Sequence, residues 1–136
     1  MKEFGFFKEL NLDAEIEYPS IESAQIGSGE PLQSRAKVIK YLENGFGLIA
    51  TASLVFDPFQ KNRKVICPFN VRTDGDWCWP SELPYLIKEY HVRIPDEFRQ
   101  KMRARVWIPP SEKELDLDIL LEAYDRLWEE RMRQNL

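Results

Sequence analysis

A tight hairpin is predicted by one stretch of the chain, Thr73-Asp74-Gly75-Asp76-Trp77-Cys78-Trp79-Pro80. Asp74-Gly75 favours a two-residue type I′ turn, because Gly adopts positive φ without strain and Asp tolerates it. The residues before it, Val65 to Arg72, are typical of a strand, and Trp77 to Trp79 form the returning strand. Pro80 ends the ladder because it has no N–H, and Ser81 is then expected to be the N-cap of a helix.

Three helices are predicted after the hairpin, and each has its own start signal. The first runs from Ser81 to Tyr90, and the second begins at Pro95, a residue favoured in the first helical turn. The third, near the C-terminus, has a capping-box pair in Ser111 and Glu114. Apolar residues then recur at steps of three and four, which predicts a buried stripe. The stripe consists of Leu115, Ile119, Leu120, Ala123, Tyr124, Leu127 and Trp128, and its expected packing residues are Leu120, Tyr124, Leu127 and Trp128.

The part of the chain before the hairpin is predicted to contain one helix and one long strand. Gln33 to Leu42 has apolar residues at helical spacing and ends at Asn44-Gly45, while Phe46 to Phe56 is rich in β-branched and aromatic residues. A short N-terminal element is expected to dock on the core through Phe4, Phe6, Phe7, Leu10 and Leu12. The predicted fold is α+β, with a small antiparallel sheet, one preceding helix and three following helices. Residues 1–136 are expected to form a single domain.

Composition and charge exclude several classes of function. The net charge is −4, and acidic residues outnumber basic ones by seven to two in residues 1–30 and by eight to four in residues 111–136. Residues 31–66 are basic, with six basic and two acidic side chains. This balance argues against a nucleic-acid-binding protein, which we would expect to be basic overall. The apolar runs are too short to span a bilayer, and the N-terminus lacks the features of a secretory signal.

No arrangement typical of catalysis, metal binding or phosphate binding is evident in the sequence. Cys67 and Cys78 lie on opposite arms of the predicted hairpin, where Cys78 should face Val71, so we expect buried free thiols in a reducing cytoplasm. They lack zinc spacing, and His91 is the only histidine. Gly27-Ser28-Gly29 lacks the lysine of a phosphate-binding loop. We therefore expect no enzymatic activity, no cofactor and no metal.

Two further groups have both a structural and a functional interpretation. Asp74 and Asp76 flank the hairpin tip, and the turn accounts for them better than acid–base chemistry does. Trp77 and Trp79 alternate onto one face of the sheet, which is more typical of a core than of a binding patch.

Acidic side chains of the last helix are the best surface candidate for a basic partner, the alternative being an ordinary solvated face. They are Asp116, Asp118, Glu122, Asp125 and Glu129. The residues that we predict to bind a partner are Asp116, Asp118 and Glu122.

About half of the chain, roughly residues 35–100, resembles a family of small bacterial immunity proteins of contact-dependent growth inhibition and related polymorphic toxin systems. The resemblance rests on these residues: Val38-Ile39-x-Tyr41-Leu42-x-x-Gly45, Asp57-Pro58, Thr73-Asp74-Gly75-x-Trp77-x-Trp79-Pro80-x-x-Leu83-x-Tyr85, Glu89-Tyr90 and Ile94-Pro95-x-Glu97-Phe98. It implies a cytoplasmic protein, without catalytic activity, that binds and blocks a cognate toxin domain. It transfers no toxin-binding residue.

Two alternative interpretations remain open at this point. The first is a small enzyme or ligand-binding domain with a site assembled from residues such as Asp76, Cys78 and His91, and the second is a subunit of a larger assembly. A concave cleft with convergent polar groups would favour the first.

Overall fold

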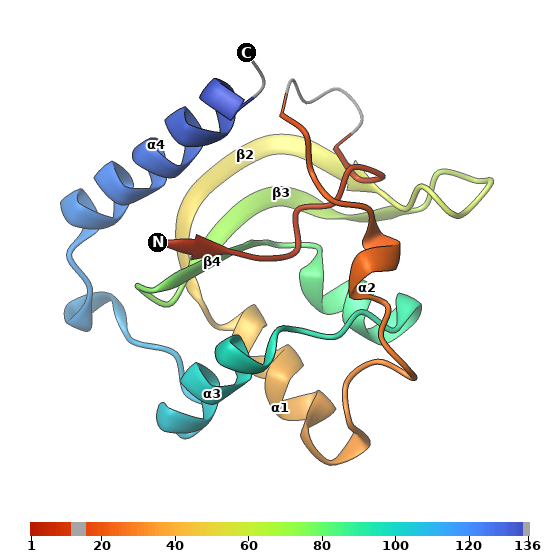
Figure 1. Cartoon of the computed structure of the whole chain (residues 1–136), viewed down its shortest axis with the longest axis horizontal. Coiled ribbons are helices and arrows are strands. Elements are labelled where there is room, and N and C mark those ends of the chain that lie inside the picture. Colours follow the sequence, from red (N-terminus) through yellow and green to blue (C-terminus); the bar gives the residue numbers. More distant parts are fainter. Residues whose placement is uncertain (12–15, 135–136) are drawn as a thin grey trace.

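A four-stranded sheet in the order β1-β4-β3-β2 lies at the centre of the structure, a computed structural model that describes residues 1–11 and 16–134 (Figure 1). The strands are β1 (Lys2–Glu3), β2 (Phe46–Phe56), β3 (Val65–Thr73) and β4 (Trp77–Pro80). The antiparallel part of the sheet, β2-β3-β4, is as predicted. The sheet as a whole is mixed, because the N-terminal strand β1 pairs parallel to β4.

Helices cover both faces of the sheet, which confirms the α+β class. They are α1 (Leu32–Glu43), α2 (Leu83–Tyr90), α3 (Asp96–Ala104) and α4 (Leu117–Gln134), with short 3-10 turns η1 (Ile21–Ala24) and η2 (Glu112–Glu114). One helix precedes the antiparallel strands and three follow them, as predicted. Helices α1, α2 and α3 pack around one core cluster, whereas α4 contacts a second one and stands apart from the other helices in Figure 1.

The hairpin forms where the sequence predicts it, but its register differs by two residues. Cys78 lies opposite Thr73, and Val71 lies opposite Pro80, so the prediction that Cys78 faces Val71 is wrong. The reason is the position of the turn: a hydrogen bond from the Asp74 amide to the Trp77 carbonyl (3.2 Å) closes it around Gly75 and Asp76, one residue later than predicted. The Asp74 carboxylate accepts hydrogen bonds from the Asp76 and Trp77 amides and so stabilises the turn at this position.

Ser81 follows β4, hydrogen-bonds to β3 and is not the N-cap that the sequence predicts for α2. Its amide donates to the Asn70 carbonyl, and its hydroxyl accepts from the Asn70 amide (3.0 Å) and donates to the Pro68 carbonyl (2.8 Å). Because the Ser81 hydroxyl is engaged in these bonds, it does not cap α2, which begins at Leu83. Glu82 takes the N-cap position and makes no capping hydrogen bond with its side chain.

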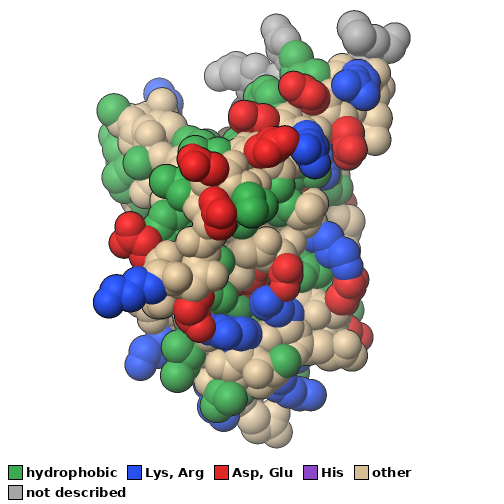
Figure 2. Space-filling view, turned by 90° about the vertical axis from the view of Figure 1, so that its left-hand side faces the viewer, with side chains coloured by type: hydrophobic (Ala, Val, Ile, Leu, Met, Phe, Trp, Pro, Cys, Tyr) green, Lys and Arg blue, Asp and Glu red, His purple; other side chains and the backbone are tan. Residues whose placement is uncertain are grey.

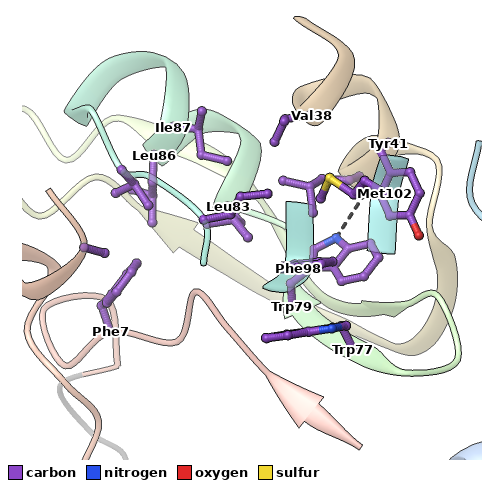
Figure 3. Close-up of a cluster of buried hydrophobic side chains, with 14 of the residues drawn as sticks. Phe7, Val38, Tyr41, Trp77, Trp79, Leu83, Leu86, Ile87, Phe98 and Met102 are labelled. Atoms are coloured by element: carbon purple, nitrogen blue, oxygen red, sulfur yellow. Dashed lines mark hydrogen bonds between the residues drawn. The ribbon is translucent and has the colours of Figure 1, made fainter. Parts of the chain in front are cut away.

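The larger core lies on the face of the sheet that α1, α2 and α3 cover, and it confirms the structural interpretation of the two tryptophans (Figure 3). Trp77 stacks on Phe98 with ring centroids 4.5 Å apart. Trp79 is fully buried, and its indole N–H donates a hydrogen bond to the Leu42 carbonyl of α1 (3.0 Å). The indole therefore joins the sheet to α1 as well as filling the core.

The smaller core lies on the opposite face of the sheet. It consists of Phe6, Ile16, Tyr18, Val71 and Cys78. The N-terminal segment serves both cores, since Phe7 enters the larger one and Phe6 the smaller one, which confirms the predicted docking element. Leu12, which the sequence assigns to the same element, lies outside the described residues. Both thiols are free; Cys78 is buried as predicted, whereas Cys67, which faces Val55 of β2, is only partly buried, so the prediction of burial is wrong there.

Two buried aspartates are bound by tyrosine hydroxyls from distant parts of the chain. The Tyr41 hydroxyl of α1 donates to Asp74 (2.7 Å), so that helix is tied to the hairpin loop. The hydroxyls of Tyr85 (2.7 Å) and Tyr90 (2.5 Å), both on α2, donate to Asp57 at the end of β2. All five residues occur in the sequence pattern quoted above for the expected resemblance. Each of them has a role in the fold that accounts for its presence there.

A buried ion pair connects the segment before α1 to α3. The Arg99 guanidinium lies 2.6 Å from the Glu30 carboxylate, and both side chains are almost completely buried. Glu30 also accepts a hydrogen bond from the Ile94 amide (2.7 Å), and Arg99 reaches Asp96 (2.7 Å). The two charges of this buried pair are therefore matched and hydrogen-bonded, as buried charges need to be.

Candidate protein-binding face

Helix α4 begins later than the sequence predicts, and this changes the environment of its first acidic residue. The capping box of Ser111 and Glu114 is present, but it caps the short η2 turn. Leu115 is then extended and separates η2 from α4. Asp116 precedes the helix, and its carboxylate accepts a hydrogen bond from the Ile119 amide (3.3 Å). Asp116 thus serves as the cap that the sequence assigns to Ser111.

One side of α4 packs against the smaller core. Leu120 is buried, and Tyr124 and Leu127 are partly buried against that core. Trp128 is 45% exposed, so the prediction that it packs inside is wrong. An α-helix advances by about 100° per residue, which places Trp128 about 80° around the helix from Leu120. The apolar stripe of α4 is therefore wider than the part of the helix that the rest of the protein covers, and Trp128 lies outside the covered part.

The outer side of α4 carries an unbroken row of carboxylates, which we name the acidic stripe: Asp118, Glu122, Asp125 and Glu129. Their spacing of four, three and four residues places them on one face of the helix. All four are exposed. Figure 2 shows this side of the molecule, where acidic side chains gather over the upper half of the view and basic ones are more frequent below.

The acidic stripe is only partly neutralised by the helix itself. Glu122 pairs with Arg126, and Glu129 lies 4.0 Å from Arg133, both at a spacing of four residues. Exposed pairs of this kind are weak and are easily exchanged for other partners. Within the described residues, Asp118 and Asp125 have no cationic group within ion-pair distance. The stripe therefore offers negative charge to a basic surface.

Exposed apolar side chains border the acidic stripe along one edge. Leu117 (46% exposed), Trp128 (45%) and Met132 (36%) lie within about 60° of one another around the helix. Large apolar side chains beside charged ones, especially a tryptophan, are typical of surfaces that bind other proteins. We name the acidic stripe together with these three residues the α4 face.

The structure brings together two of the three predicted partner-binding residues. Asp118 and Glu122 are neighbours on the acidic stripe, whereas Asp116 lies before the helix and lines a groove with Asp76 and Lys101 of neighbouring segments. The apolar border was not predicted, because Trp128 was assigned to the core. No signal in the sequence reveals it, because residue spacing gives the direction of each side chain around the helix but not how much of the helix the sheet covers.

Residues considered for catalysis lie in separate places with structural roles. Asp76 is at the hairpin loop and pairs with Lys101, and His91 is the exposed left-handed residue that ends α2. Cys78 is buried in the smaller core, where burial raises the pKa of its thiol to about 12. The thiol is therefore protonated at neutral pH and is a poor nucleophile in this setting.

Comparisons with protein-family models, with curated proteins and with solved structures found no match to this chain. Within residues 1–11 and 16–134, no group of three or more potential ligand side chains has the geometry to hold a metal ion. No helix among the described residues combines the length and the apolar character that crossing a membrane requires.

Proposed function

We propose that this chain is a cytoplasmic immunity protein that binds a cognate toxin domain and blocks it by occlusion, without chemical modification. The observation that carries the proposal is the α4 face, where the acidic stripe lies beside exposed Leu117, Trp128 and Met132. The resemblance of residues 35–100 to immunity proteins supports the same conclusion. In this proposal the toxin presents a basic surface to α4.

The two parts of the α4 face have different physical roles in such a complex. Carboxylates such as Asp118 and Asp125 attract a basic partner from a distance and increase the association rate. Trp128 and its apolar neighbours exclude water once contact is made and slow dissociation. Speed and retention are both needed by an inhibitor that must meet a few toxin molecules before they act.

Co-expression with the toxin domain encoded beside this chain's own gene tests the role directly. Growth of cells that make both proteins supports it, together with a stable one-to-one complex of the purified components. The proposal fails if the chain neither binds that domain nor protects the cells. Protection that is accompanied by a covalent change in the toxin would also contradict it, because occlusion alters no bond.

Charge reversal on the acidic stripe tests the surface. We expect D118K, E122K and D125K together to slow association by about tenfold or more at low salt and to weaken its salt dependence. Asp116 is left unchanged because it caps α4. A matched control reverses three exposed glutamates of η1, α1 and α2, Glu22, Glu43 and Glu89. Equal effects of the two triple variants would exclude the α4 face, though not the immunity role.

A further inference from the structure

A cavity of about 500 Å³ is lined by the segment that follows β1, by η1 and by the segment that leads into α3. Its size is within the range of small-molecule sites. The walls are mainly apolar and include Phe4, Phe7, Ile26 and Ile94. Arg131 is the one residue of α4 among those that line it. The cavity is therefore distinct from the outward-facing acidic stripe.

Four charged side chains line this cavity, and three of them are already paired. Glu3 pairs with Arg131, and Asp96 lies 2.7 Å from Arg99. Arg93 is the exception, because within the described residues its guanidinium makes no hydrogen bond or ion pair. The cavity is thus lined by apolar walls and by Arg93, which has unused donors and also lines a neighbouring groove between the start of α1 and α3.

The backbone around Arg93 is held in place. Its amide donates a hydrogen bond to the Ala24 carbonyl of η1 (2.9 Å), and the next residue, Ile94, is buried and bonded to Glu30. The hydrogen bond between Arg93 and Ala24 therefore connects η1 to the segment before α3, which both line the cavity. A guanidinium supplies a planar pair of donors that matches the two oxygens of a carboxylate.

We propose that this cavity binds a small amphipathic carboxylic acid, with its hydrocarbon part against Phe4, Phe7 and Ile26 and its carboxylate on Arg93. Apolar burial provides most of the affinity, and the arginine distinguishes the acid from a neutral molecule of the same shape. The inference does not depend on the proposed function, since neither the ligand nor its site involves the acidic stripe.

Calorimetric titration with octanoate and with octanol tests the proposal. We expect octanoate to bind the wild-type protein saturably, with one site per chain, and more tightly than octanol. R93Q should weaken octanoate binding by about tenfold or more, because it removes a charge-assisted hydrogen bond, and should leave octanol binding unchanged. R103Q is the matched control, since Arg103 is exposed on α3 and does not line this cavity.

A cavity-filling variant checks the location of the site. Ser23 lines the cavity and is exposed, so S23W should place an indole in it without disturbing the cores, and binding of both probes should be lost. Circular dichroism of the variant confirms that it is folded. The proposal is overturned if octanoate shows no saturable binding, if octanol binds equally well, or if R93Q leaves octanoate binding unchanged.

Discussion

Helices α2 and α4 differ sharply in how much of their surface the protein encloses. Although α2 has only eight residues, it buries Leu83, Leu86 and Ile87. With 18 residues, α4 buries only Leu120, and that side chain is still 6% exposed. The short helix is part of the core and contributes to stability, whereas the long one rests on the second face of the sheet and leaves most of its side chains in solvent. In this molecule, the amount of helix is a poor guide to where stability resides.

The largest expected effect tests this contrast directly. Leu86→Ala should lower the free energy of unfolding by about 3–5 kcal/mol, because a completely buried leucine leaves a cavity. Trp128→Ala removes a larger side chain from α4 but should cost less than about 1 kcal/mol, because that side chain is half exposed. Urea denaturation measures both. A loss at Trp128 as large as that at Leu86 would show that α4 packs more tightly than the structure indicates.

A second contrast concerns the carboxylates of the two helices. Glu82, which precedes α2, is buried, and its Oε2 atom has no hydrogen-bond partner among the described residues. Burial raises the pKa of its carboxyl from 4.5 to about 7. Between these two pH values the folded protein binds more protons than the unfolded chain, so the stability that this group provides is lost as the pH rises.

The Glu82→Gln variant should therefore be more stable than the wild type at pH 8, by roughly 3 kcal/mol, and of similar stability at pH 4. Denaturation across this pH range measures the difference. Glu122→Gln on the exposed stripe is the control, and its stability should follow the wild-type pH profile. A constant difference between Glu82→Gln and wild type at all pH values would contradict the assignment of a buried, titrating carboxyl.

The smallest expected effect is at the corner where the chain leaves α3 on its way to α4. Val106 has φ +53°, although β-branched residues strongly resist positive φ. The Val106 amide donates to the Arg103 carbonyl (2.9 Å) and the Trp107 amide to the Met102 carbonyl (2.8 Å). These bonds define a Schellman motif, in which glycine is usual at the position of Val106.

Val106→Gly should therefore raise the free energy of unfolding by about 1 kcal/mol, because it relieves the strain at this position. Ala104→Gly, two residues earlier and inside α3, should lower it by about 0.5–1 kcal/mol. Thermal or urea denaturation distinguishes a gain from a loss. If both substitutions destabilised the protein, the corner would not be strained.

Local patterns predicted the elements well, because each depends on neighbouring residues alone. Strand β2 has the predicted bounds, and α1 extends the predicted range by one residue at each end. The predicted hairpin register was wrong because the Asp74 side chain stabilises a turn one residue further along, at Gly75-Asp76. Backbone propensity at Asp74-Gly75 contains no information about those side-chain hydrogen bonds. Local spacing also identified Ser111 and Glu114 correctly as a capping box. It could not show that this box caps the short η2 turn and not the long helix α4.

Contacts between distant residues could not be predicted from spacing. Glu30 and Arg99 are separated by 69 residues, and only the folded chain shows that they form a buried pair. The candidate α4 face was predicted in part, since the periodic carboxylates Asp118 and Glu122 were evident. Its apolar border was not, because a helical wheel shows which residues share a side but not how wide a strip the rest of the protein covers.

The two-residue strand β1 has a consequence for how copies of the chain behave toward each other. The Lys2 amide donates to the Asp76 carbonyl (2.9 Å), and the Phe4 amide donates to the Cys78 carbonyl (3.1 Å). Through these two hydrogen bonds, β1 covers the outer edge of β4. Without these bonds, the Asp76 and Cys78 carbonyls at this edge would be open to a strand from another molecule, and unpaired sheet edges promote aggregation. Deleting a few N-terminal residues would thus leave the edge of β4 unpaired and able to hydrogen-bond to another copy of the chain. This shortest strand therefore protects the protein against self-association in concentrated solution.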